Sequence, residues 1–355
     1  MSGSVLRTAP RPGRVKIGRR LDMRILAGGR CAGHDRALAV AIAVSAVSAF
    51  AASGEPASPG DGFRWSDEDP ASLALWEGGK PVWVYNHGVM SRKGVSPSYN
   101  RSGYLHPLYG LDGEVLTEDF AKDHLHHRGV FWAWPHIAIG GKEYQTWVPT
   151  EPLRVRHARF VRKEAGVSSA ALAVENDWIL GAERVVREEV AIRVMPADAT
   201  GRLIDFELAW TALEKPVALR GAEGKSYGGF TIRYNTRPNE PGRIAEKDVA
   251  ITVPDGLSKK DLTETRLPWA DLSAPFPGAP GPSGAAIFIH PSHPDHPPTW
   301  LTRHYGCLCV GWPGVKGGTL EPGKTARCRY RVWVHRGVPD VAALKAVFEA
   351  YAALP

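Results

Sequence analysis

Residues 101–134 hold the densest group of side chains able to transfer protons or bind a metal. They contain four of the thirteen histidines of the chain: His106, His124, His126 and His127. The last three lie in the run Asp-His-Leu-His-His-Arg-Gly, which begins at Asp123. Histidine suits proton transfer because its ordinary pKa, about 6.5, leaves both protonation states populated near neutral pH. A functional site is therefore predicted in this stretch.

Acid–base catalysis is one interpretation of this stretch. We expect four side chains to take part in proton transfer: His106, Asp123, His126 and His127. We expect others to bind the substrate through charge, hydrogen bonds or ring stacking: Arg101, Tyr104, Arg128, Trp132, Trp134, Lys225, Tyr227 and His290. Aromatic faces beside clustered polar groups suit sugars, whose C–H surfaces stack while their hydroxyls form hydrogen bonds. A buried histidine network that only fixes a turn is the alternative.

A divalent metal site is a second interpretation. If residues 123–129 are extended, alternate side chains share a face. His124 and His126 then lie on one face, and Asp123 and His127 lie on the other. Two imidazoles on one face of a strand can chelate a metal if a further histidine and a carboxylate complete the shell. No cofactor is predicted outright, and a divalent metal held by His124 and His126 stays an alternative.

Charge and motifs exclude several classes of function. Residues 1–51 carry nine of the 44 basic and two of the 37 acidic residues, which leaves 35 of each sign, so no nucleic-acid partner is expected. The glycine-rich segment 221–230 lacks the G-x-x-x-x-G-K-[ST] pattern of a phosphate loop. No apolar stretch reaches the length of about 20 residues that a membrane span needs. The expected partner is a small molecule or an oligosaccharide.

Alternating apolar and polar residues predict strands along most of the chain, as at Val190, Ile192 and Val194. The predicted strands cover residues 73–77, 81–85, 104–109, 115–117, 143–147, 153–163, 170–179, 183–195, 203–213, 217–219, 231–234, 285–290, 308–312 and 326–335. Residues 254–284 are expected to form a surface excursion, and residues 340–353 a helix capped by Asp340. Strands without intervening helices indicate an all-β fold, a large antiparallel β-sandwich with a C-terminal helix.

The chain divides into three segments by composition. Residues 1–51 form a leader whose basic flank, apolar run and A-x-A cleavage pattern ending at Ala51 are typical of a secretory signal. We therefore expect export to the periplasm or out of the cell, with either Met1 or Met23 as the start. Residues 52–62 form a linker rich in proline, glycine and serine. Residues 63–355 are expected to form a single large β-sandwich domain.

Three cysteines follow the predicted leader. Cys307 and Cys309 share one face of a predicted strand. Either could form a disulfide with Cys328 if Cys328 lies on a neighbouring strand. Three buried, reduced thiols are the alternative.

Four stretches carry a family resemblance. They are Arg101-Ser-Gly-Tyr-Leu-His-Pro-Leu-Tyr, Asp123-His-Leu-His-His-Arg-Gly-Val-Phe-Trp-Ala-Trp, Tyr227-Gly-Gly-Phe and Phe288-Ile-His-Pro. From about Leu73 to Leu354 the chain resembles the methane oxygenase PmoA-like family of exported bacterial proteins, a domain of unknown function. The resemblance implies a β-rich fold and no established activity. The strand layout also looks like the supersandwich of galactose mutarotases, which is a likeness of fold.

The leading hypothesis is an exported carbohydrate-active enzyme that uses histidine and carboxylate acid–base catalysis. Its reaction would be that of a hydrolase, a lyase or an epimerase. A non-catalytic carbohydrate-binding protein is the first alternative, and it would leave a bound glycan unchanged. A metal-dependent oxidoreductase is the second alternative, and it would hold stoichiometric metal. The oligomeric state is not predicted.

Overall fold

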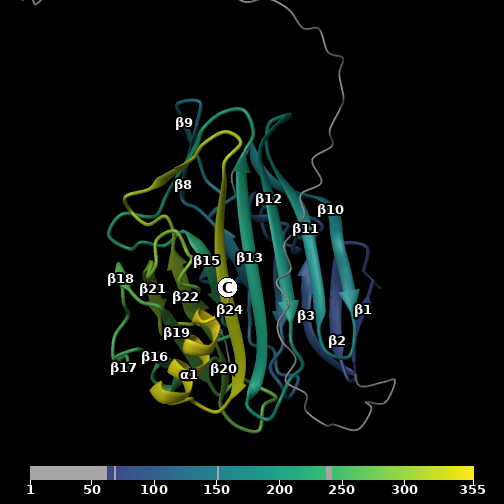
Figure 1. The fold of residues 1–355 in the computed structure, drawn as a ribbon, viewed down its shortest axis with the longest axis vertical. Coiled ribbons are helices and arrows are strands. Elements are labelled where there is room, and N and C mark those ends of the chain that lie inside the picture. Colours follow the sequence, from purple (N-terminus) through teal and green to yellow (C-terminus); the bar gives the residue numbers. More distant parts are fainter. Residues whose placement is uncertain (1–61, 68, 150–151, 237–241) are drawn as a thin grey trace, which may run out of the picture. The chain divides into compact units, whose positions relative to one another are not determined.

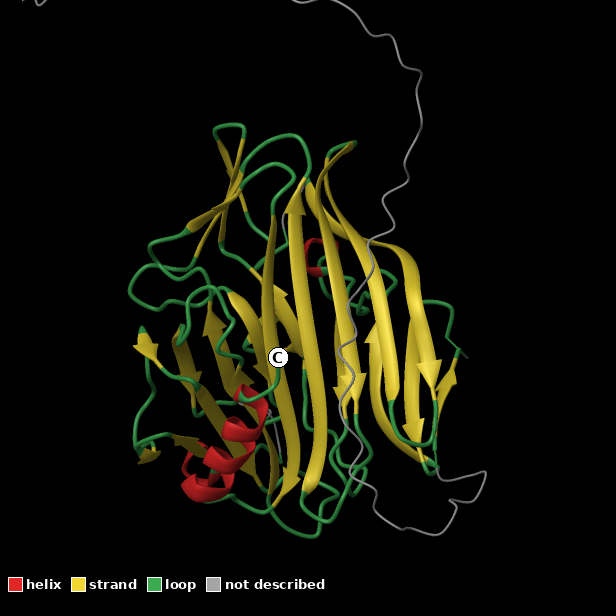
Figure 2. Cartoon of the chain, viewed as in Figure 1, coloured by secondary structure: helices red, strands yellow, loops and turns green. Residues whose placement is uncertain are grey.

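The computed structural model describes residues 62–67, 69–149, 152–236 and 242–355. The described residues form two nine-stranded sheets, two smaller sheets and one α-helix (Figures 1 and 2). The predicted leader, residues 1–51, and the predicted linker up to residue 61 lie outside the described residues. The predicted division into leader, linker and domain therefore stays a prediction.

The first large sheet carries the histidine-rich region. Its strands, in spatial order, are β1 (Phe63–Ser66), β2 (Ser72–Glu77), β3 (Lys80–Asn86), β4 (Tyr104–Leu108), β7 (Val130–Ala133), β15 (Gly229–Arg233), β22 (Cys307–Gly311), β21 (Thr299–Arg303) and β18 (Thr265–Arg266). Strands β7, β15 and β22 pair antiparallel, which brings residues near 130, 230 and 310 side by side.

The second large sheet contains the longest strands. In spatial order they are β10 (Leu153–Ala165), β11 (Ala170–Leu180), β12 (Glu183–Val194), β13 (Gly201–Ala212), β24 (Thr325–Arg336), β20 (Ser283–Ile289), β19 (Trp269–Ala274), β16 (Ala250–Val253) and β17 (Gly256–Leu257). In β12 the predicted alternation is confirmed, because Val190, Ile192 and Val194 are buried between more exposed neighbours. The four pairings from β10 to β24 are all antiparallel.

Two small sheets and short helices complete the described elements. One small sheet contains β23 (Gly318–Leu320), β14 (Val217–Arg220), β8 (His136–Ile139) and β9 (Lys142–Tyr144). The other is a ribbon of β5 (Asp119–Ala121) and β6 (His124–Arg128). Short 3₁₀ helices cover Pro97–Tyr99 and Glu246–Asp248. Helix α1 (Val341–Ala352) begins after Asp340, whose side chain accepts a hydrogen bond from the Ala343 backbone, so the predicted cap is confirmed.

The hydrophobic core lies between the two large sheets. Leu75 and Val82 from the first sheet join one buried cluster with Val190 and Val332 from the second. Helix α1 covers part of the second sheet on its other side, against β20 (Figure 2). The predicted antiparallel β-sandwich with a C-terminal helix is therefore confirmed.

The other side of the first sheet has its own buried cluster, and we call this side the outer face. Neighbouring residues alternate between the two sides, because Leu105 and Val130 join the core while Tyr104 and Phe131 join the outer cluster. The members of the outer cluster are Tyr104, Phe131, Ala133, Trp147, Leu301, Cys307 and Cys309. The ribbon of β5 and β6 lies against β4 and β15.

Two expectations from the sequence are corrected here. Residues 254–284 are not a surface excursion throughout: most residues of 255–266 and 277–282 are exposed, but β19 between them is buried along its whole length within the second sheet. Of the two alternatives left open for the cysteines, the disulfide with Cys328 is not formed. Cys307 and Cys309 lie on the outer face of β22, Cys328 lies in the core on β24, and all three are buried free thiols. The reduced alternative is therefore confirmed. Within the described residues, no helix has the length and apolar character needed to cross a membrane.

Candidate functional site

Strand β6 carries the histidine run, and it is bulged. Asp119 pairs with Arg128, and Ala121 pairs with His124. Residues 119–121 of β5 therefore lie opposite residues 124–128 of β6, which has extra residues between the two pairs. A bulge changes the direction in which the side chains of a strand point. The predicted regular alternation, with His124 and His126 opposite His127, is therefore wrong.

The bulge brings three histidine rings together. His124 stacks on His127 with ring centroids 4.5 Å apart and an interplanar angle of 8°. His126 meets His127 edge-on at 4.6 Å, and it lies 5.6 Å from His124. On its other side His124 stacks on Tyr305 at 5.2 Å. We call His124, His126 and His127 the histidine cluster.

Asp123 is hydrogen-bonded to one member of this cluster. Its Oδ2 lies 2.8 Å from Nδ1 of His124, and its Oδ1 accepts a hydrogen bond of 2.8 Å from Arg233. Arg233 is completely buried and also donates to Glu118. Burial by itself would raise the pKa of Asp123, but the hydrogen bond with His124 and the charge of Arg233 hold this pKa below its ordinary value. Asp123 is therefore ionised at neutral pH and orients the His124 ring.

His126 and His127 are in a different electrostatic state. Burial lowers the pKa of His126 to about 3, and the charges of Arg101 and Arg233 contribute in the same direction. Burial also lowers the pKa of His127 well below its ordinary value. Nδ1 of His127 is buried and has no hydrogen-bond partner among the described residues. Both rings are therefore neutral at neutral pH, and they can donate or accept hydrogen bonds without carrying charge.

Arg128 and Tyr104, both predicted to bind substrate, lie beneath the cluster. Arg128 is completely buried, and its guanidinium forms an ion pair of 2.8 Å with Asp119. It also donates to the Tyr99 carbonyl and lies over the Phe120 ring. Tyr104 is completely buried as well and donates to the same carboxylate at 2.9 Å. These contacts support the base of the ribbon, and the predicted binding roles stay untested.

Arg101 is held by backbone carbonyls. Its guanidinium donates to the carbonyl of Thr146 and, at 2.9 Å, to that of Trp147, and it lies 5.0 Å from the Phe131 ring centre. Burial lowers the pKa of Arg101 to about 9, and the nearby charge of Arg128 adds to this effect. Among the residues that the structure describes, no carboxylate forms an ion pair with Arg101.

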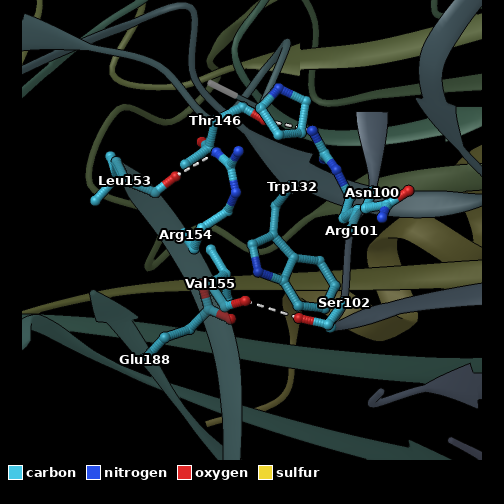
Figure 3. Close-up of a pocket in the computed structure, with 11 residues that line it drawn as sticks. Asn100, Arg101, Ser102, Trp132, Thr146, Leu153, Arg154, Val155 and Glu188 are labelled. Atoms are coloured by element: carbon cyan, nitrogen blue, oxygen red, sulfur yellow. Dashed lines mark hydrogen bonds between the residues drawn. The ribbon is translucent and has the colours of Figure 1, made fainter. Parts of the chain in front are cut away.

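Arg101 also borders a small cavity that reaches toward the core. Its volume is about 40 Å³, and Trp132 and Glu188 line it together with Arg101. Figure 3 shows the Trp132 indole between Arg101 and Glu188. A cavity of this size has room for water molecules and not for a sugar.

The two tryptophans predicted as a stacking surface face the core. Trp132 stacks on Phe230, and Trp134 packs against Trp178 and Trp210. Because side chains alternate along β7, Phe131 is the aromatic residue of this strand that lies on the outer face. Its neighbour there is Trp147, which lies 5.5 Å from His127. The structure thus brings Phe131 and Trp147 to the cluster in place of Trp132 and Trp134.

Of the remaining predicted site residues, one lies near the histidine cluster and three do not. Tyr227 is near the cluster, 4.7 Å from the Trp147 ring, whereas Lys225 is exposed and no described hydrogen bond or ion pair joins it to the histidines. His106 binds Thr117 at 3.1 Å and lines a separate groove. His290 lies on the other large sheet and binds the Leu354 carbonyl at 3.0 Å, close to the C-terminus. His106 and His290 therefore do not join the histidine cluster.

Sequence analysis missed Arg233, Tyr305 and Trp147. Arg233 and Tyr305 lie more than 100 residues after this segment, Trp147 lies 19 residues after Arg128, and no local motif points to any of them. The aromatic and basic character of these residues is common in strands, so only the pairing of β15 with β7 and β22 brings Arg233 and Tyr305 to the site. Trp147 is held there by a hydrogen bond from its backbone N–H to the Trp134 carbonyl at the end of β7.

Two further stretches match catalytic motifs by spacing alone. Residues 224–228 read Gly-Lys-Ser-Tyr-Gly, the spacing of a serine-hydrolase elbow, but Ser226 is completely buried and its hydroxyl bonds Thr299. Residues 318–325 read Gly-Thr-Leu-Glu-Pro-Gly-Lys-Thr, the spacing of a phosphate loop. They form the turn between β23 and β24, where a phosphate loop needs a helix N-terminus. Neither stretch has the structural setting of its motif.

Metal binding has no preformed site in the described part of the chain. No group of three histidine, cysteine or carboxylate side chains there is arranged to hold a metal ion. The predicted pair His124 and His126 has ring planes 77° apart, and the hydrogen bond with Asp123 already engages Nδ1 of His124. Metal binding stays an alternative for experiment.

Comparison with known proteins gives one family match. The family described as "Family of unknown function (DUF6807)" matches residues 72–349, and no curated protein matches the chain. The match does not show the PmoA-like resemblance.

Three solved structures are similar to the chain. A candidate kojibiose phosphorylase from the human microbiome has 7% identity and a TM-score of 0.31, over 61% of this chain and 24% of that one. A GalM/aldose epimerase homologue from C. elegans has 9% identity and a TM-score of 0.33, over 76% and 97%. A galactose mutarotase related enzyme from Lactobacillus acidophilus has 10% identity and a TM-score of 0.31, over 78% and 99%. The chain spans about a quarter of the phosphorylase, and similarities this low say nothing of activity.

Proposed function

We propose a function for this chain, which belongs to the family of unknown function DUF6807: it binds a carbohydrate at the histidine cluster and transforms it by acid–base catalysis. The reaction would be a hydrolysis, an elimination or an epimerisation. His124 transfers the proton, and Asp123 holds its ring in place.

The observation that carries this proposal is the hydrogen bond between Asp123 and His124. An ionised carboxylate only accepts hydrogen bonds, so Nδ1 of His124 must donate to it. Nε2 of His124 is then the basic nitrogen of the neutral ring. The His124 side chain is 35% exposed while that of Asp123 is 13% exposed, so solvent and substrate can reach the histidine. A histidine oriented by a carboxylate is the usual arrangement of a general base.

In this mechanism His124 takes a proton from the substrate through Nε2 and later returns it. Asp123 stabilises the imidazolium that forms in between, because its negative charge is 2.8 Å from Nδ1. Arg233 keeps Asp123 ionised and fixes its second oxygen. The neutral rings of His126 and His127 are suited to hydrogen bonds with hydroxyl groups.

A sugar fits the surroundings of His124 better than a small acid or an apolar ligand. The half-buried rings of Tyr305 and Tyr227 flank the cluster with Trp147 behind them, and they offer apolar surface to C–H groups. Arg233 and Arg128 pair with carboxylates, and Arg101 is held by backbone carbonyls, so all three guanidinium groups have partners and a neutral polyhydroxyl ligand needs no charge of its own.

The test is a turnover screen of the purified chain on a panel of glycans, with variants of the pair. Asp123→Asn and His124→Gln should each lower kcat by about 10²–10⁴-fold, the usual contribution of acid–base catalysis. His136→Gln is the matched control, because His136 also pairs with a carboxylate, Glu143, at the surface of another sheet. Equal activity of all three variants would contradict the proposal.

Two other outcomes would select the alternatives. Saturable glycan binding without any change in the glycan would indicate a non-catalytic binding protein. Stoichiometric metal in the purified chain that is lost in the His124→Ala, His126→Ala double variant would indicate a metal-dependent enzyme. Elemental analysis of both proteins separates these cases from acid–base catalysis.

Export is part of the proposed function. It is supported by the signal pattern of residues 1–51, which ends at Ala51. Expression of the full chain with its leader should give a periplasmic or secreted product that begins at residue 52, as measured by intact mass. A cytoplasmic product with an uncut leader would contradict export.

A further inference from the structure

A groove on the outer face of the first sheet lies beside the histidine cluster. We propose that this groove, formed by β2, β3 and β4, binds a second sugar unit, so that the ligand is an oligosaccharide and not a monosaccharide. This inference rests on the proposed function. It also gives His106, which the structure separates from the cluster, a role in binding instead of proton transfer.

The groove has the size of a site for one sugar ring. Its volume is about 360 Å³, within the range of roughly 300–1,000 Å³ typical of small-molecule sites. The residues that matter for binding are Ser72, Trp76, Asn86, Met90, His106 and Asp119. They combine an indole, an amide, an imidazole and a carboxylate, the side chains that polyhydroxyl ligands require.

The polar floor of the groove is already ordered. Ser72 donates to Oδ1 of Asn86 at 2.9 Å, and Nδ2 of Asn86 donates to the His106 carbonyl at 2.8 Å. Ser72 is 8% exposed and Asn86 is 4% exposed, so both are fixed by packing. An amide nitrogen carries two hydrogens, and this one uses a single described hydrogen bond. In this proposal a hydroxyl group of the ligand accepts the second hydrogen.

His106 presents its other ring nitrogen to the same groove. Nδ1 of His106 is engaged by Thr117 at 3.1 Å, which leaves Nε2 for a ligand. Burial lowers the pKa of His106, so the ring is neutral at neutral pH and suits a hydroxyl partner. Trp76, Ala74 and Val84 supply the apolar surface of the groove.

Two residues of the groove lead toward the histidine cluster. Asp119 lines the groove and forms the ion pair with Arg128 at the end of β6. Met90 lines the groove and packs against the outer cluster that contains Phe131 and Trp147. One extended ligand can therefore contact both places along the same face of the sheet.

The test compares ligands of increasing length. The probes are glucose, galactose, mannose, xylose and galacturonate, each with its 1,4-linked disaccharide, trisaccharide and tetrasaccharide, titrated into the wild-type chain by calorimetry. We expect the series that binds to gain at least tenfold in affinity between the monosaccharide and the disaccharide or trisaccharide. Equal affinity at every length would overturn the inference and leave the proposed function intact. No binding in any series would overturn both.

Two variants test whether the groove is responsible for the gain in affinity. Trp76→Ala and His106→Gln should each weaken oligosaccharide binding about tenfold and leave monosaccharide binding unchanged. Trp65→Ala is the matched control, because Trp65 lies on the neighbouring strand and packs against Trp83 toward the core. Thermal unfolding of each variant identifies any loss that comes from misfolding. Unchanged oligosaccharide affinity in folded Trp76→Ala and His106→Gln would overturn the inference.

Discussion

The histidine cluster makes the stability of the fold depend on pH, and His126 gives the sharpest test. Its pKa is lowered to about 3, mainly by burial, with contributions from Arg101 and Arg233. In the unfolded chain the same group has an ordinary pKa of about 6.5. Below that pH the unfolded chain binds a proton that the folded chain does not bind. The contribution of His126 to stability is therefore fully present above pH about 6.5 and is lost as the pH falls toward 3.

The size of this effect follows from the difference between the two pKa values. At pH 5 the unfolded histidine is about 1.5 pH units below its pKa, and each unit is worth about 1.4 kcal/mol. The folded ring is still neutral at that pH, because its pKa is about 3. His126 should therefore lower the free energy of unfolding by about 2 kcal/mol between pH 7 and pH 5.

Urea denaturation at pH 7 and pH 5 measures this loss. The wild-type chain should lose about 2 kcal/mol more than His126→Gln between the two pH values, because glutamine does not titrate. Leu125→Gln is the control, since Leu125 is also partly buried on β6 and the variant keeps the histidine. The reasoning is refuted if His126→Gln and the wild type lose the same free energy over this pH range.

Three further perturbations test the packing around the site and the core. Arg233→Met should cost about 3–5 kcal/mol of unfolding free energy in urea, because it removes the buried cation that pairs with Glu118 and Asp123. Arg159→Met at an exposed pair should cost less than about 1 kcal/mol, and similar losses in both variants would count against the assignment. Glu188→Ala should lower the free energy of unfolding by at least about 3 kcal/mol in the same measurement. The reason is that buried Glu188 accepts hydrogen bonds from Asn176, Trp178 and Trp210. An unchanged free energy of unfolding would disprove that network. Finally, in the chain that begins at residue 52, a thiol reagent should detect three reactive cysteines only after denaturation, because burial raises the pKa of Cys309 to about 11 and also raises those of Cys307 and Cys328. Fewer than three would reveal a disulfide.

The long strands β10 to β13, the strand β24 and the helix follow from local patterns in the sequence, whereas short strands such as β5, β7 and β21 were not predicted. The alternation at Val190, Ile192 and Val194 appears unchanged in β12, and the cap at Asp340 begins α1 as predicted. Local patterns failed at β19, where Trp269 and its neighbours looked like part of a proline-rich excursion. The strand does alternate, with Asp271 and Ser273 between apolar residues, but it is only six residues long and lies beside proline-rich segments. Its polar side chains are buried, and Asp271 is hydrogen-bonded to His335, a partner that no local pattern shows.

The sequence by itself determined that chemistry concentrates at residues 123–128, because histidines and a carboxylate gather there in the chain. Only the tertiary structure decided which of them work together. The bulge in β6 depends on its pairing with β5, and it turns His124 toward Asp123 and places all three rings in contact. Arg233 and Tyr305 join the site through pairing between strands that are more than 100 residues from β6 in the chain. Side-chain direction in a strand is set by register, and register is a property of the whole sheet, so no local motif could assign the acid–base pair.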